Sequence, residues 1–280
     1  MDKIQNCIFL FAIISCWPLT VNSQISYDGT ECVNKRFQVA THVAVDSAMR
    51  QPLFTQEEID EALTATSVFF DDICMSFIQC EYNVMQNDYT LGIVRSAPIS
   101  VDVRLNELRN RFSKRRRINM FFLESIEDTN CGIGTFEGIN TLNDANVFIE
   151  RDCNEGLATQ IAHQLGHIFG LLDTHHPEGM ELVDGSNCSV AGDMLCSTPA
   201  DPFEQSFISS ADSIRLLTTD LITDFYTESE FVYELRDPND DFYNPLISNI
   251  MSAYPCKCSF TQEQLSVMAS NYKSSPIKHF

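Results

Sequence analysis

The chain has 280 residues, of which 44% are hydrophobic and 20% are charged. This composition excludes a disordered, collagen-like or coiled-coil protein, and the length allows one large core or two lobes that share a cleft. The 18 Lys and Arg residues against 39 Asp and Glu residues give a net charge of −21. Nucleic acid and anionic membrane surfaces are therefore not expected as partners, because both are bound through concentrated basic charge.

The first 23 residues predict a secretory signal peptide. Lys3 precedes a short apolar run over residues 7–17, and Val21 and Ser23 are small residues at the −3 and −1 positions of a cut before residue 24. The run is too short to span a bilayer as a helix, and no later segment is apolar enough to span one. A buried N-terminal helix is the alternative. We expect a secreted, extracellular protein whose mature chain covers residues 24–280.

The cysteines predict disulfide bonds. Eleven are present, and two of them leave with the signal peptide. The nine that remain are Cys32, Cys74, Cys80, Cys131, Cys153, Cys188, Cys196, Cys256 and Cys258. A secreted chain oxidises its thiols, and an odd number leaves at least one thiol free, metal-bound or joined to another chain.

The first half of the mature chain alternates predicted strands and helices. Apolar and polar residues alternate from Phe37 to Val45, which is typical of a strand. Thr55 to Glu58 forms a capping box that opens a helix, and a second strand is predicted from about Cys74 to Met85. A second helix covers Val101 to Phe112. The cations at residues 114–117 complement its C-terminus or, in the alternative, mark a proprotein cleavage site.

The second half adds a third strand, a central helix and a final helix. The third strand is predicted from Ile118 to Glu124, and a short edge strand from Asn146 to Ile149. A helix from Leu157 to Phe169 is stopped by Gly170 and is followed by a loop-rich, acidic stretch. A capping box over Thr261 to Gln264 opens the last helix. The pattern is mixed α/β without internal repeats.

Histidines on the central helix predict a zinc site. Four of the six histidines lie close together, at His163, His167, His175 and His176. His163 and His167 are four residues apart, so they share a helix face and can bind one Zn²⁺, whereas a merely polar helix face is the alternative. Gly170 lets the chain turn out of the helix and bring Asp173 to the metal as a third ligand. His175 or His176 takes that place if the turn is longer.

The string from His163 to Asp173, His-Gln-Leu-Gly-His-Ile-Phe-Gly-Leu-Leu-Asp, resembles the metzincin metallopeptidase motif H-E-x-x-H-x-x-G-x-x-H. More narrowly, the chain resembles the pappalysin family, which includes the pregnancy-associated plasma protein-A peptidases and ulilysin. Gly192 to Pro199 is similar to the family segment G-D-x-x-x-D-T-P, and Asn249 to Met251 is similar to its Met-turn. Further matches to family strands and helices cover residues 37–46, 55–77, 117–126 and 260–268.

The resemblance implies an α/β (α+β) fold of the metzincin-like zincin type, in a single domain over residues 24–280. The upper lobe, about 36–172, would carry a twisted sheet and two long helices. The lower lobe, about 173–280, would hold loops, the Met-turn at Met251 and the C-terminal helix. The metal would lie in the cleft between the two lobes.

The same resemblance bears on the cysteines. Pairing of Cys188 and Cys196 with Cys256 and Cys258 would hold the lower lobe together. Cys32 lies in the short stretch before the first strand, where a disulfide is expected and a zinc-capping thiol is the alternative.

The chain departs from the family at residues that carry the chemistry. Gln164 stands where the family has the glutamate that takes a proton from water on the metal and passes it to the leaving amine. Asp173 replaces the third histidine. Ala253 stands where the family has a tyrosine thought to stabilise the transition state, and Tyr254, one position further on, is the candidate for that role.

Calcium is a candidate second cofactor on the same grounds. Ser197 replaces an aspartate that can help to bind Ca²⁺ in relatives, while Asp193, Thr198 and Asp201 remain.

These features together predict a secreted pappalysin-like protein that binds zinc and a protein or peptide partner, with peptidase activity weakened or lost at Gln164. One alternative is an active zinc endopeptidase in which Asp173, Glu178 or Glu181 serves as the base. Another is a metal-free structural or binding module.

Overall fold

The computed structural model describes residues 32–45, 51–85, 101–124, 126, 131–141, 145–151, 153, 155–175, 180–202, 236–254 and 257–278, without the side chains of residues 101–104. The predicted signal peptide lies outside the described residues, as do His176, Glu178 and Cys256. Within the described part, no helix has the length and apolar character needed to cross a membrane.

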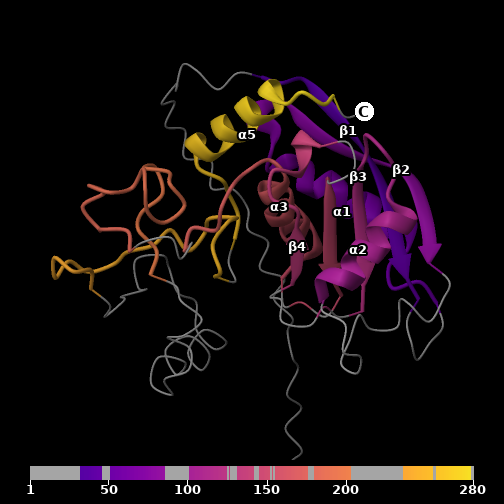
Figure 1. Ribbon diagram of the computed structural model, residues 1–280, viewed down its shortest axis with the longest axis horizontal. Coiled ribbons are helices and arrows are strands. Elements are labelled where there is room, and N and C mark those ends of the chain that lie inside the picture. The colour runs from indigo at the N-terminus through magenta and orange to yellow at the C-terminus, as the bar shows by residue number, and fades with distance from the viewer. Residues whose placement is uncertain are drawn as a thin grey trace, which may run out of the picture.

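A five-stranded sheet organises the described chain (Figure 1). Its strands are β1 (Lys35–Ala44), β2 (Met75–Met85), β3 (Ile118–Leu123), β4 (Gly132–Gly134) and β5 (Asn146–Glu150). They lie in the order β2-β1-β3-β5-β4, with β4 antiparallel to β5 and the other pairs parallel. The helices are α1 (Gln56–Val68), α2 (Val101–Phe112), α3 (Leu157–Ile168) and α5 (Gln262–Ser274), with short 3-10 turns η1 (Asp71–Ile73) and η2 (Gly138–Asn140).

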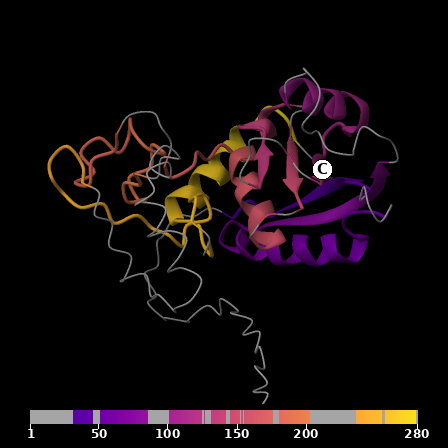
Figure 2. The same cartoon turned by 90° about the horizontal axis from the view of Figure 1, so that it is seen from below.

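Helices cover both faces of the sheet, with α1 on one face and α2 on the other (Figure 2). Strand β3 shows why. Met120 and Phe122 pack into the core on the side of α1 and α3, while Phe121 and Leu123 pack into the core on the side of α2. A parallel strand buried on both faces reads as a nearly continuous apolar run, which is the character of β3.

Most predicted elements are confirmed. Both capping boxes form: Thr55 accepts the Glu58 amide at 3.2 Å, and Thr261 accepts the Gln264 amide at 3.2 Å. The prediction of an edge strand over residues 146–149 is wrong about its place, because β5 lies between β3 and β4. The true edge, β4, consists of Gly-Ile-Gly, which is too short and too rich in glycine to show a strand period.

Glycine allows β4 to lie directly against α3. A Cβ atom on Gly134 would lie 2.4 Å from the carbonyl oxygen of Gln164 and 3.1 Å from the Cβ of His167. Only a residue without a side chain tolerates that approach. The edge strand is therefore placed beside the helix that carries the predicted zinc ligands.

Three disulfides form among the described cysteines. Cys32 bonds to Cys74, which confirms the disulfide expected at Cys32, and Cys131 bonds to Cys153. Cys188 bonds to Cys196 across a separation of eight residues. The predicted pairing of these two with Cys256 and Cys258 is wrong, because the loop between them turns back and brings their Cα atoms to 5.0 Å.

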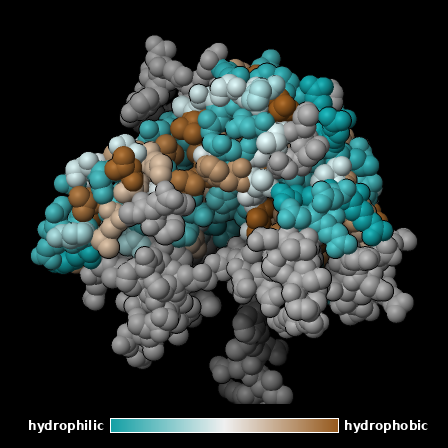
Figure 3. All heavy atoms as spheres, viewed as in Figure 1, coloured by the Kyte–Doolittle hydropathy of each residue, from teal (hydrophilic) through white to brown (hydrophobic). Residues whose placement is uncertain are grey.

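Loops replace regular elements over residues 180–202, drawn in orange to one side of the sheet in Figure 1. Large apolar side chains are exposed in these loops at Met180, Val190 and Met194. In the same view, Figure 3 shows hydrophobic residues on the side of the molecule where these loops lie. The opposite side, where the sheet and its helices lie, is mainly hydrophilic.

A buried histidine lies within the sheet, away from the predicted zinc ligands. His42 of β1 is 1% exposed and stacks on Phe121, with 4.7 Å between the ring centroids. Its Nε2 lies 3.4 Å from Oδ1 of Asn119. Burial lowers the pKa of His42 to about 4, although the Asn119 contact opposes the shift. The imidazole is therefore neutral at physiological pH.

We expect His42 to make the fold sensitive to acid. Between the unfolded pKa near 6.5 and the folded value of about 4, the unfolded chain binds the extra proton, so stability falls as the pH falls through this window. The loss approaches about 3 kcal/mol at the lower end. Urea unfolding of wild type and His42→Gln at pH 7 and pH 4.5 measures it. An equal drop in both proteins would contradict the assignment.

Candidate metal site

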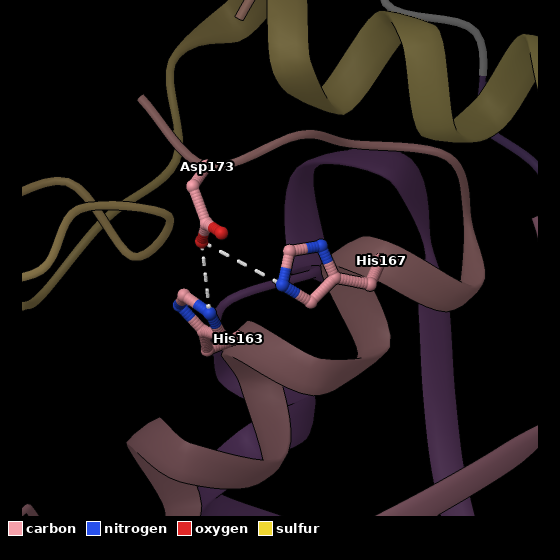
Figure 4. A group of neighbouring side chains, drawn as sticks. All are labelled: His163, His167 and Asp173. Atoms are coloured by element: carbon pink, nitrogen blue, oxygen red, sulfur yellow. Dashed lines mark ion pairs between the residues drawn. The ribbon is translucent and has the colours of Figure 1, made fainter. Parts of the chain in front are cut away.

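Helix α3 presents two histidines to one point in space (Figure 4). Nδ1 of His163 lies 2.8 Å from the carbonyl oxygen of Ile250, and Nδ1 of His167 lies 2.9 Å from that of Leu171. A carbonyl only accepts hydrogen bonds, so each Nδ1 carries the proton and each Nε2 keeps its lone pair. Both imidazoles are thus held in the tautomer that binds a metal through Nε2.

Asp173 completes the group. Its Oδ1 lies 3.2 Å from Nε2 of His163 and 3.6 Å from Nε2 of His167 (Figure 4). A tetrahedral zinc ion with bonds of about 2.0–2.1 Å holds its ligand atoms about 3.3 Å apart. Among the described residues, these three form a group in which each side chain offers one ligand atom to a metal. The three ligand atoms all lie within 4.8 Å of one another. The donor set and its spacing fit zinc.

The ionisation of the group also suits a metal. Burial lowers the pKa of His167, and the neighbouring charge of His163 adds to the shift, so this imidazole is neutral at physiological pH. Burial by itself would raise the pKa of Asp173, but the close contact with His163 and the positive charge that His167 and His163 carry when protonated outweigh it and hold that pKa well below its usual range. Neutral imidazole and ionised carboxylate are the forms that bind metal.

Gly170 brings Asp173 back to the histidines. Helix α3 ends at Ile168, and Gly170 follows with φ of +91°. Its amide donates to the His167 carbonyl at 2.9 Å, and the Leu171 amide donates to the Gly166 carbonyl at 2.9 Å. This left-handed turn reverses the chain at the end of the helix. It places Asp173 in the group, whereas His175 is not a member of it and His176 is outside the described residues.

Replacing Gly170 with alanine is expected to destabilise the protein by about 2 kcal/mol. The left-handed backbone costs about 1 kcal/mol. A Cβ would also lie 2.4 Å from Nδ2 of Asn271, whose hydrogen bond to the Phe169 carbonyl at 2.8 Å would break, at about 1 kcal/mol more. Gly185→Ala is the matched control, because Gly185 has φ of +69° and nothing within 4 Å of its Cβ position. If both variants lose the same free energy of unfolding in urea, the contact with Asn271 does not contribute to the loss.

Gln164 lies on α3 beside β4, at the place of the predicted base. It is 4% exposed, and its Cγ and Nε2 lie 3.4 Å from the position that a Cβ on Gly132 would take. Within the described part of the chain, its Oε1 has no hydrogen-bond partner. A side-chain amide accepts a hydrogen bond but does not take up a proton at physiological pH. The site therefore has a buried acceptor where a base would be needed.

The predicted Met-turn lies beneath the histidines. Met251 is fully buried. Its Sδ lies 2.4 Å from the position that a Cβ on Gly166 would take, and Gly166 lies between the two histidines on α3. The Met251 amide donates to Oδ1 of Asn249 at 2.8 Å. Asn249 in turn donates to Gln264 in the capping box of α5 at 2.9 Å. The floor of the site is thereby tied to the last helix.

The remaining predicted residues gather around Asp201. Tyr254 is 2% exposed and donates its hydroxyl to Oδ1 of Asp201 at 2.9 Å. Thr174 donates its hydroxyl to Oδ2 of Asp201 at 2.6 Å. Thr174 is absent from the predicted site because no local pattern links it to a residue 27 positions later.

A second carboxylate group lies in the loops. Burial raises the pKa of Glu181 to about 7, with further contributions from Asp193 and Asp201. Thr198 donates to both carboxylate oxygens of Asp193, at 2.7 and 2.8 Å. Burial raises the pKa of Asp193 to about 6 despite these bonds. Asp193 and Thr198, two of the residues expected to bind calcium, are thus hydrogen-bonded to each other.

No protein-family model matches the chain, and no curated protein matches its sequence. Among solved structures, the chain is similar to mature mirolysin of Tannerella forsythia, a metzincin-type metallopeptidase solved in complex with a cleaved peptide. The two share 12% sequence identity and a TM-score of 0.53, and the likeness covers 85% of this chain and 95% of the mirolysin chain. With the five-stranded sheet and its helices, this likeness shows that the chain has a metzincin-like α/β fold.

Proposed function

We propose that the protein is a secreted, zinc-binding member of the peptidase-fold class whose proteolysis is weakened or lost. The observation that carries the proposal is Gln164, a buried amide on the same helix as two histidines that converge with Asp173. The three disulfides support an extracellular setting, since such bonds persist in oxidising compartments.

His163 and His167 would hold zinc through Nε2, and Asp173 would hold it through a carboxylate oxygen. When bound, zinc supplies Lewis acidity that polarises a carbonyl and lowers the pKa of water. Oε1 of Gln164 would accept a hydrogen bond from a water molecule or hydroxyl group and orient it. Because the amide does not accept the proton, no group at this position passes one to the leaving amine.

A peptide partner has a place to bind next to this group. Strand β4 ends the described sheet, pairing with β5 through Ile133 and Phe148 on one side only. An extended peptide can add to such an edge through backbone hydrogen bonds. Mirolysin, the similar structure, is in complex with a cleaved peptide. The protein would then act by binding a peptide or protein segment beside the metal.

Metal analysis and a peptidase assay on the same preparation test the proposal. Native mass spectrometry of mature protein is expected to show one zinc ion per chain, removable by chelator. Denatured protein substrate is expected to stay intact. Cleavage that a chelator abolishes would establish an active endopeptidase instead, and a chain without zinc would establish a metal-free binding module.

Calcium is proposed as a separate cation in the loops. Glu181 supports it, because the side chain is 6% exposed and its Oε2 has no hydrogen-bond partner among the described residues. A cation would favour the ionised form of this carboxylate, whose pKa burial has raised. Added Ca²⁺ is expected to raise the melting temperature of wild type at pH 7.5 but not that of Glu181→Gln. Equal shifts would contradict the assignment.

A further inference from the structure

Asp201 joins two segments that the sequence keeps far apart. Its Oδ1 accepts the Tyr254 hydroxyl, and its Oδ2 accepts the Thr174 hydroxyl at the short distance of 2.6 Å. Hydrogen bonds from hydroxyl groups to a carboxylate are about twice as strong as those between neutral groups. One carboxylate therefore fixes the loop after α3 to the segment after the Met-turn.

Thr174 passes this constraint to the metal group. It follows Asp173 directly, is 3% exposed, and donates its amide to the Met251 carbonyl at 3.0 Å. Both its backbone and its side chain are thus held. Asp173 lies in irregular structure beyond Gly170, where no helix fixes its direction. Fixing a free residue costs conformational entropy, so an Asp173 that is already ordered through Thr174 spares metal binding part of that cost.

Tyr254 holds the other oxygen of Asp201. The ring is 2% exposed, and the hydroxyl that a transition-state role would need donates to Asp201. The Tyr254 amide donates to the hydroxyl of Ser252 at 3.3 Å, so the residue is also fixed through its backbone. In this arrangement the tyrosine restrains Asp201 and does not offer its hydroxyl to a substrate.

We propose that Asp201 is a positioning residue for the third metal ligand, acting on Asp173 through Thr174, with Tyr254 as its restraint. The inference rests on the proposed zinc site and extends it to residues that touch neither metal nor substrate. It gives Tyr254 a role that does not depend on catalysis, which fits a chain with Gln164 in place of a base.

Zinc affinity, measured by competition with a chromogenic chelator, tests the proposal. Thr174→Val keeps the shape and removes the hydroxyl, and it is expected to weaken zinc binding about 10–100-fold, as loss of an outer partner typically does. Thr174→Ser is expected to restore the affinity. Asp201→Asn and Tyr254→Phe are expected to weaken binding in the same direction. The visible spectrum of the Co²⁺-loaded protein should change in Thr174→Val, because the direction of Asp173 changes.

Thr66→Val is the matched control. Thr66 is fully buried and donates its hydroxyl to the Ala158 carbonyl at 3.0 Å, a bond that joins α1 to α3 without touching the loop of Asp173. Its loss should lower the melting temperature of the metal-free protein and leave zinc affinity unchanged. If Thr174→Val behaves in the same way, Asp201 is structural only and the proposal is overturned. If wild type itself binds no zinc, the proposed function fails first, and the two failures are distinguishable.

Discussion

Replacing Gln164 with glutamate is expected to raise the rate of peptide hydrolysis by about 10²–10⁴ in the zinc-loaded protein. The variant changes one terminal group at a side chain that is already buried beside β4 and whose Oε1 is without a partner in the described structure. A carboxylate there accepts the proton that the amide leaves in place. The rest of the group stays as it is, so the gain isolates the missing base.

Gln160→Glu is the matched control for that variant. Gln160 lies one helical turn earlier on α3, is 3% exposed, and donates its amide to the Glu150 carbonyl at 3.2 Å. A carboxylate at this position loses the bond and places the charge one helical turn before Gln164 and not at it, so we expect lower stability and no hydrolysis. Cleavage of denatured protein substrate, with and without chelator, measures both variants. If zinc-loaded Gln164→Glu does not cleave the substrate, the changes at Asp173 and Ala253 suffice to abolish catalysis.

The convergence of His163, His167 and Asp173 could be predicted from the sequence because its determinants are local. His163 and His167 share a face through helical spacing alone, and Gly170 marks the turn three residues later. The local spacing alone therefore predicts that Asp173 falls within reach of both histidines. The same reasoning explains the capping boxes at Thr55 and Thr261, since each needs only a residue three positions on.

Features that depend on distant contacts did not emerge from the sequence. Strand β4 exists because Gly134 tolerates the carbonyl of Gln164, a contact between segments 30 residues apart. The bond between Cys188 and Cys196 follows from a loop whose turns have no periodic signal. Asp201 meets Tyr254 only because the fold brings the Met-turn beside the loop of Asp173. A residue pattern within a short stretch of sequence carries no information about contacts between residues that are far apart in the chain.

Zinc is expected to stabilise the protein by about 4 kcal/mol when its free concentration is 1,000 times the dissociation constant. For a chain of this size, the gain corresponds to a rise in melting temperature of about 8–16 °C. A chelator should remove the gain from wild type. His167→Gln should lack it, because Nε2 of His167 is one of the three converging ligand atoms. His42→Gln should keep it, because His42 lies with Phe121 on the sheet and is not a member of the group.

The same measurement identifies the third ligand. Asp173→Ala should abolish the zinc-dependent rise, since its Oδ1 is the atom that lies near both Nε2 atoms. His175→Ala should retain the rise, because that imidazole is not part of the converging group. The reverse pattern would mean that the loop rearranges on binding zinc and that the longer turn is the one used. Because the readout is unfolding and not hydrolysis, it decides the ligand even in a protein that cleaves nothing.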